Sequence, residues 1–179
     1  CVIQPIVDEL VKTSDYVARR SAIAAFNAAN QYVKRGIALT PVKFGISFNT
    51  TFLNQAGSLI HVYNDGSVHL NHGGTEMGQG LYTKVAQIVA HEFQIDAALV
   101  KITATTTGKV PNTSATAASS GTDLNGMAAT RAARTIKDRI AAFLSDEYQT
   151  DQANVVFANG QVHVGADAMK FAEAVKRAY

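Results

Sequence analysis

The chain has 179 residues, 47% of them hydrophobic, and 16 basic and 14 acidic side chains give it a net charge of +2. This length suits one ordinary globular domain with its own core. The small, evenly spread charge argues against a nucleic-acid surface, and no apolar run is long enough to cross a membrane. With no leader sequence in sight, we expect a soluble cytoplasmic protein. Because the chain begins with Cys1, its single cysteine, we also expect a fragment of a longer polypeptide that has no internal disulfides.

The N-terminal part is predicted to be helical and then extended. Residues 5–12 are typical of a short helix, and Ser14 is expected to cap a long helix that runs to about Lys34. Over 36–48 the apolar residues alternate imperfectly around Pro41. This pattern predicts a strand pair or one broken strand at a sheet edge.

The remainder of the chain mixes hairpins with helices. Asp65-Gly66 and Asn159-Gly160 are strong hairpin-turn signals. Since strands and helices do not alternate strictly, we predict an α+β fold in which helices pack on a mostly antiparallel sheet. The predicted elements are strands at 58–63 and 67–71, a helix at 81–93, a strand at 100–104, a helix after 121, strands at 154–157 and 161–164, and a helix at 166–179.

The most informative stretch covers residues 71–93. Four glycines occur in the eight positions from Gly73 to Gly80, and a helix follows them. Such a turn leaves unpaired N–H groups at the positive end of the helix dipole, which predicts an anion site. It lacks the Walker lysine and the GxGxxG spacing, so an ordinary tight connection is the alternative. An amide held between two glycines, Gln79 between Gly78 and Gly80, favours recognition of a heterocycle edge.

A second unusual segment, residues 103–122, is dominated by Thr, Ser and Ala and leads into a helix. A flexible low-complexity loop is one interpretation. Small residues and hydroxyls ahead of a helix also suit a phosphate or a ring oxygen, since they combine close backbone approach with O–H donors.

Other chemistries find little support. His91-Glu92 lacks the second histidine of a zinc-binding helix. His72 and Glu76 could share a metal, but the sequence offers no third ligand nearby. No nucleophile elbow and no paired carboxylates occur. We therefore predict no metal-binding residue in this chain.

The string GGTEMGQGLYTK, residues 73–84, resembles the pterin-binding segment of the molybdenum hydroxylases, the family of xanthine dehydrogenase and aldehyde oxidase. The resemblance implies that Gly78, Gln79 and Gly80 contact a molybdopterin cofactor that carries molybdenum.

The string NTSATAASSGTDLNGMA, residues 112–128, resembles the second cofactor loop of the same family. There Ala118 matches an alanine near the metal. Thr116 and Ser119 match residues that approach the cofactor phosphate.

A third string, KFGISF at 43–48, resembles the segment that presents a phenylalanine to a flat aromatic substrate, and Phe48 is the matching position. Stacking would orient a planar ring without hydrogen bonds. The alternative is a core phenylalanine on a strand. Asn49 stands where the family commonly has Thr.

Thr75 and the run 113–120 are more similar to xanthine dehydrogenases than to aldehyde oxidases. The resemblance implies an oxidoreductase that hydroxylates xanthine or hypoxanthine in purine catabolism. Its electrons would leave through 2Fe-2S clusters and FAD to NAD, all outside this chain. The implied partners are the purine, the rest of the subunit, an iron–sulfur/FAD subunit or domain, and further copies in a homo-oligomer.

The family's glutamate base and substrate-anchoring arginines have no counterpart in this sequence. Residues 1–179 are therefore expected to form a partial molybdopterin-binding domain that is inactive alone. The alternatives are a non-catalytic binding domain of the same fold and an aldehyde oxidase-type hydroxylase.

Overall fold

A computed structural model describes residues 2–110 and 112–179. The expectation that rests on Cys1 lies outside the described residues. The chain divides into two units, residues 1–45 and 46–179, and each is described by itself.

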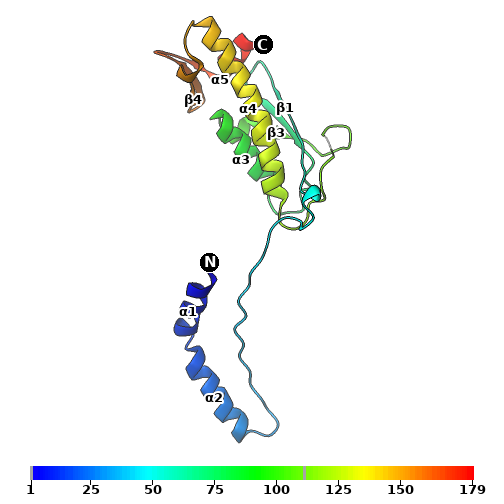
Figure 1. Ribbon diagram of the computed structural model, residues 1–179, viewed down its shortest axis with the longest axis vertical. Coiled ribbons are helices and arrows are strands. Elements are labelled where there is room, and N and C mark those ends of the chain that lie inside the picture. Colours follow the sequence, from blue (N-terminus) through cyan, green and yellow to red (C-terminus); the bar gives the residue numbers. More distant parts are fainter. Residues whose placement is uncertain (1, 111) are drawn as a thin grey trace. The chain divides into compact units, whose positions relative to one another are not determined.

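The first unit contains two helices, α1 (Ile3–Thr13) and α2 (Tyr16–Ala29) (Figure 1). Ser14 ends α1 instead of capping α2, because its N–H and its hydroxyl both donate to the carbonyl of Leu10. Asp15, the residue between the two helices, has a φ of 50°, which lies in the left-handed region. The prediction of an N-cap at Ser14 was wrong, and α2 also ends five residues before Lys34.

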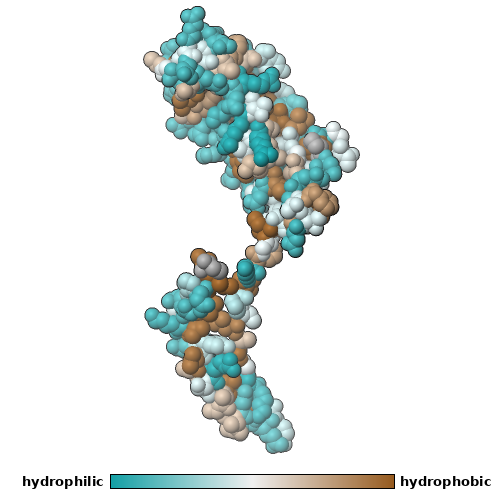
Figure 2. Space-filling view, in the orientation of Figure 1, coloured by the Kyte–Doolittle hydropathy of each residue, from teal (hydrophilic) through white to brown (hydrophobic). Residues whose placement is uncertain are grey.

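The strands predicted at 36–48 are also wrong, since in the described part of the chain the first strand begins at Ser58. Pro41 has no N–H to donate, and none of the described strands pairs with this segment. Its start is held by Asn27, whose amide bonds both the N–H and the carbonyl of Arg35 at 2.8 and 2.9 Å. Figure 2 shows apolar atoms gathered on the α1–α2 pair.

The second unit begins with a three-stranded sheet. Strands β1 (Ser58–Val62) and β2 (Val68–His72) form the predicted antiparallel hairpin, and Gly66 takes the positive φ of 83° that its turn requires. Strand β3 (Val100–Ile102) pairs with β2 in parallel. The order β1-β2-β3 leaves β1 and β3 at the sheet edges.

Two helices, α3 (Leu81–Phe93) and α4 (Gly121–Glu147), lie side by side against this sheet (Figure 1). They approach closely at Gly126, where a Cβ atom would come within 2.7 Å of Ile88 Cδ1. The helix predicted for 81–93 is confirmed, and apolar side chains on one of its faces enter the core. The buried side chains of α3 are Leu81, Val85, Val89, Ala90 and Phe93.

An ion-pair cluster also joins the two helices. Glu92 on α3 receives Arg134 Nε at 3.1 Å and Lys137 Nζ at 3.6 Å, both from α4. Lys137 also donates to the carbonyl of Glu92 and lies over the ring of Phe157, 5.2 Å from its centroid. The middle of α4 is therefore fixed to α3 and to the second sheet.

The second sheet contains β4 (Val155–Ala158), β5 (Gln161–Val164) and β6 (Asp167–Lys170), all antiparallel. The helix predicted at 166–179 is corrected here, since its first part is β6 and α5 covers only Phe171–Ala178. Gly165, with φ of 59°, turns the chain back so that β6 pairs with β5.

The α+β class is confirmed, with two small sheets in place of one. In the described residues no helix is both long and apolar enough to cross a membrane. Short 3-10 turns occupy Thr51–Leu53, Ala97–Leu99 and Gln152–Asn154.

Candidate functional site

The glycine loop, residues 73–80, carries its own anion. The Glu76 carboxylate accepts N–H bonds from Gly78 at 2.9 Å, Gly80 at 3.0 Å and Tyr82 at 2.9 Å. The Tyr82 bond, helped by those from Gly80 and Gly78, holds the pKa of Glu76 below its ordinary value. The anion expected at the start of α3 is therefore an internal side chain, and these N–H groups are not available to a ligand.

Gln79 is also bonded within the loop. Its Oε1 accepts the N–H of Met77 at 2.6 Å, and its Nε2 donates to the carbonyl of Thr75 at 2.9 Å. The flanking Gly78 and Gly80 have φ of 98° and 74°, a region that side chains with a Cβ rarely adopt. The amide is thereby held in one orientation on an exposed turn.

The second small-residue segment lies directly against this loop. Thr75 donates its N–H to Thr116 Oγ1 at 2.8 Å. A Cβ atom at Gly73 would meet Thr113 Oγ1 at 2.3 Å, so only glycine permits this approach. Segments about 40 residues apart in the sequence thus form one surface.

A cleft of about 390 Å³ lies between the two segments and contains three of the predicted site residues, Gln79, Thr116 and Ser119. Gly78, Gly80 and Ala118 do not line it, although each is next in sequence to a residue that does. The lining residues are Met77, Gln79, Leu81, Lys84, Thr116, Ala117, Ser119, Gly121 and Thr122.

Backbone strain marks the second segment where it borders the cleft. Ala118 and Ser119 have φ of 54° and 53°, and Ser47 has φ of 70°. Non-glycine residues in this region cost about 1 kcal/mol each. Ser47 donates its N–H to the carbonyl of Ala118 at 2.9 Å, which brings the third motif to the same place.

Phe48 follows directly and belongs to no strand, so it is not a strand-core residue. Its N–H donates to Asn54 Oδ1 at 2.9 Å, and Asn54 Nδ2 donates to its carbonyl at 2.8 Å. This reciprocal pair fixes the backbone and leaves the side chain half-buried. Phe48 does not line the cleft but is bonded to its wall through Ser47.

Comparison with known proteins shows the family of this chain. Residues 9–179 match the family model described as the molybdopterin cofactor-binding domain. The chain belongs to this family.

The chain is 52% identical over 136 residues to mouse xanthine dehydrogenase/oxidase, 46% over 158 residues to the rice xanthine dehydrogenase and 55% over 121 residues to that of Dictyostelium discoideum. These matches cover 76%, 88% and 68% of this chain. They cover 10%, 12% and 9% of the relatives, so the chain spans about a tenth of their length.

Two solved structures have a similar fold. CO dehydrogenase from Oligotropha carboxidovorans matches 70% of this chain and 16% of its own with a TM-score of 0.64 at 25% identity. Quinoline 2-oxidoreductase from Pseudomonas putida 86 matches 97% of this chain and 23% of its own with a TM-score of 0.74. At 22% identity the second likeness concerns the fold alone.

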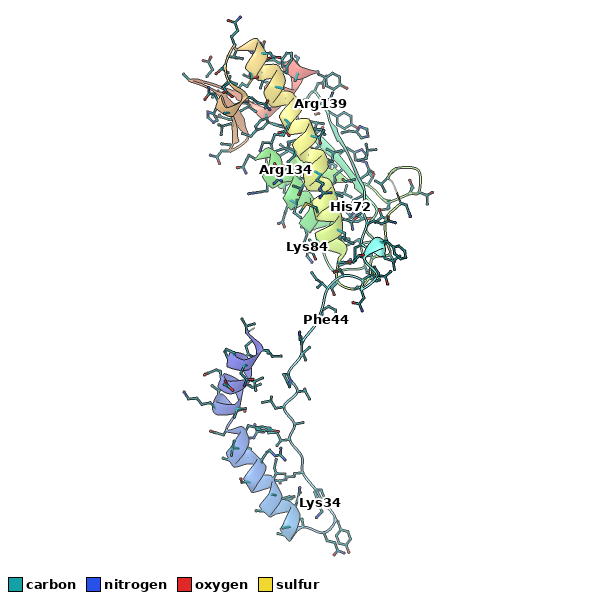
Figure 3. The ribbon with its side chains drawn as sticks, in the orientation of Figure 1. Lys34, Phe44, His72, Lys84, Arg134 and Arg139 are labelled. Atoms are coloured by element: carbon teal, nitrogen blue, oxygen red, sulfur yellow. The ribbon has the colours of Figure 1, made fainter. Side chains whose placement is uncertain are left out.

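The donors of this molybdopterin-binding domain fit an anionic organic cofactor. Lys84, on the first turn of α3, lines the cleft and forms no ion pair in the described parts of the chain (Figure 3). Across 2–110 and 112–179 the Ser119 hydroxyl likewise makes no internal hydrogen bond. A cation and hydroxyls beside glycine-rich backbone suit a phosphate group. Lys84 was missed in the sequence, although it lies one helical turn after Gly80.

The possible sharing of a metal by His72 and Glu76 gains no third ligand. Over residues 2–110 and 112–179, no three His, Cys, Asp or Glu side chains converge. The Glu76 carboxylate is already surrounded by N–H donors, and His72 is 2% exposed. Both side chains instead support the glycine loop.

Proposed function

We propose that this chain is part of a molybdenum hydroxylase that oxidises a purine, xanthine or hypoxanthine, and that it contributes cofactor and substrate contacts but not a complete active site. The observation that carries this proposal is the convergence of three separated motifs. The bonds Thr75–Thr116 and Ser47–Ala118 bring the glycine loop, the Thr/Ser/Ala segment and the Phe48 segment together.

The two loops would hold molybdopterin across the cleft. Bound molybdopterin supplies the molybdenum centre at which a substrate carbon is hydroxylated. Lys84 and the hydroxyls of Thr116 and Ser119 offer charge and donors to the cofactor phosphate. Gln79 lies beside them, and Gly78 and Gly80, which are favoured there by their positive φ, have no side chain to crowd a ring.

Phe48 would orient the substrate. Its backbone is fixed by Asn54, so the ring can offer a flat face at little entropic cost. Stacking on a purine restricts tilt without demanding hydrogen bonds, which fits a planar heterocycle better than a small aldehyde. The names of the relatives support the same substrate class.

The other components would come from elsewhere in the protein. A general base, the substrate-anchoring arginines and the rest of the cofactor cage lie outside this chain, as do the 2Fe-2S clusters, FAD and NAD site. The segment alone is expected to be inactive, because losing part of a multipoint site removes contacts while the cost of ordering the ligand remains.

Metal and pterin analysis of the full-length protein, freshly purified and active, tests the proposal. We expect molybdenum and pterin near one per active site, and faster turnover of xanthine than of aldehydes. An active enzyme without molybdenum would refute the proposal. Turnover of aldehydes alone would support the aldehyde oxidase-type alternative. A protein that contains the cofactor but has no activity would support the alternative of a non-catalytic binding domain.

A further inference from the structure

His72, at the end of β2, is a buried titratable residue that the proposed chemistry does not use. Its side chain is 2% exposed and is bonded to the start of the glycine loop. Its Nδ1 accepts the N–H of Gly74 at 3.1 Å. Because Nδ1 acts as an acceptor, the ring is neutral and its proton is on Nε2. The described residues offer that Nε2 no hydrogen-bond partner.

The surroundings hold the ring in this orientation. Tyr82 on α3 contacts it edge to face, with ring centroids 5.3 Å apart and planes at 86°. Thr105 donates to the carbonyl of His72 at 3.1 Å and lies 3.2 Å from the Tyr82 hydroxyl. Gly74 is equally confined, since a Cβ atom there would come within 2.7 Å of Asn125 Nδ2 on α4.

Few charged groups face the ring. Among the described residues, Glu76 is the carboxylate whose charge acts on it, and Tyr82 is the titratable group that contacts it from α3. Lys109, on the segment that carries Thr105, is bonded to Thr103 Oγ1 and to the carbonyl of Ala104. Burial lowers the pKa of His72, and the charge of Glu76 offsets only part of this effect.

We propose that neutral His72 is a positioning residue that fixes the glycine loop by accepting the Gly74 N–H, and that protonation of His72 releases the loop. A protonated Nδ1 cannot accept a hydrogen bond and would direct its own N–H at that of Gly74. Gln79 belongs to this loop, and its side chain donates to the carbonyl of Thr75. Release of the loop therefore displaces Gln79, which lines the cleft. This inference rests on the proposed function for its consequence, but not for the contact itself.

The sign of the pH effect follows from burial. The folded state disfavours the charged ring, so the loop is fully held above the ordinary histidine pKa and is released as pH falls through the lower folded value. Cofactor loss should therefore accelerate on the acid side and not on the alkaline side.

Two substitutions separate the acceptor from the charge. In His72→Asn the side-chain oxygen takes up the position of Nδ1 and accepts the same bond, but it does not titrate. In His72→Phe the ring is retained without an acceptor. His91→Asn, an exposed histidine on α3, is the matched control.

Hydrogen–deuterium exchange of the 73–80 segment in the full-length protein reads the contact without any cofactor. We expect protection in His72→Phe to be roughly fivefold lower than in the wild type at neutral pH, the effect of one lost hydrogen bond, and to show no further fall in acid. Protection should fall only as pH is lowered below the ordinary histidine pKa of 6.5 in the wild type and in His91→Asn, and stay constant in His72→Asn. Molybdenum release from loaded enzyme should be faster in His72→Phe than in the wild type at neutral pH. It should accelerate in acid in the wild type and in His91→Asn, and not in His72→Asn.

Unchanged loop protection in a folded His72→Phe protein would overturn the inference. So would a fall in protection at acid pH in His72→Asn equal to that of the wild type, a comparison that holds even if the phenylalanine variant does not fold. A protein that never contains molybdenum would refute the proposed function while the exchange data still decide the role of His72.

Discussion

Thr75 and Thr116 are joined by a 2.8 Å hydrogen bond from the backbone N–H of the first to the side-chain oxygen of the second. The bond links the glycine loop to the Thr/Ser/Ala segment across the mouth of the cleft. Thr116 thus fixes the width of the cleft while its own O–H remains available as a donor.

Thr116→Val should loosen this link. Valine keeps the shape of threonine but accepts no bond, so we expect a loss of about 1 kcal/mol in folding stability and a lower cofactor content. Thr116→Ser should restore both. The measurements are chemical denaturation and molybdenum analysis of the full-length protein. Thr135→Val, on the exposed side of α4, is the control, and an equal loss of molybdenum there would contradict the assignment.

Glu76→Gln should lower the melting temperature at neutral pH, because the amide lacks the charge that caps α3. The folded pKa of Glu76 is below its ordinary value of 4.5, so its stabilisation is complete above that value and is lost as pH falls through the folded pKa. The gap between wild type and variant should therefore close in acid. Glu173→Gln, an exposed residue of α5, is the control. A gap that persists at the lowest pH would show that the charge is not responsible.

Lys84→Met should reduce molybdopterin content roughly tenfold, since a hydrogen bond to a charged group is stronger than a neutral one. Methionine keeps the apolar stem on α3, so the melting temperature of the cofactor-free protein should not change. Lys84→Arg should recover part of the content. Lys101→Met on β3 provides an exposed control, and equal loading of the Lys84→Met and Lys101→Met proteins would exclude a phosphate contact.

Phe48→Ala should weaken substrate orientation by on the order of 1–3 kcal/mol in kcat/KM, with cofactor content near normal. Steady-state kinetics per bound molybdenum measure the effect. Phe52→Ala, four residues away and 75% exposed, should leave kinetics unchanged. Loss of molybdenum with unchanged turnover per metal would make Phe48 a packing residue.

The sequence predicted elements whose signals are local. The Asp65-Gly66 hairpin and the helix α3 depend on residues close together in the sequence, so turn propensity and periodicity were sufficient. The strands expected at 36–48 failed for the opposite reason, since a strand requires a partner and alternation alone does not supply one. At 166–179 the apolar pattern missed Gly165, whose turn makes β6 possible.

The same division applies to the site. Resemblance located Gln79, Thr116 and Ser119, which the structure brings to one cleft. It could not show that the Glu76 carboxylate binds the N–H groups at the start of α3. A carboxylate two residues before a glycine does not by itself indicate where the side chain points or which groups it contacts. The close approach of Gly73 to Thr113 is likewise a long-range contact that no local pattern encodes.

The internal carboxylate in the glycine loop bears on the order of enzyme maturation. If the N–H groups at the start of α3 depended on the cofactor for their hydrogen bonds, the loop would stay unstructured until the cofactor bound. Here Glu76 already satisfies the N–H groups of Gly78, Gly80 and Tyr82. The polypeptide can therefore complete this part of its fold before the cofactor binds, so that the cofactor enters a loop whose shape is already set.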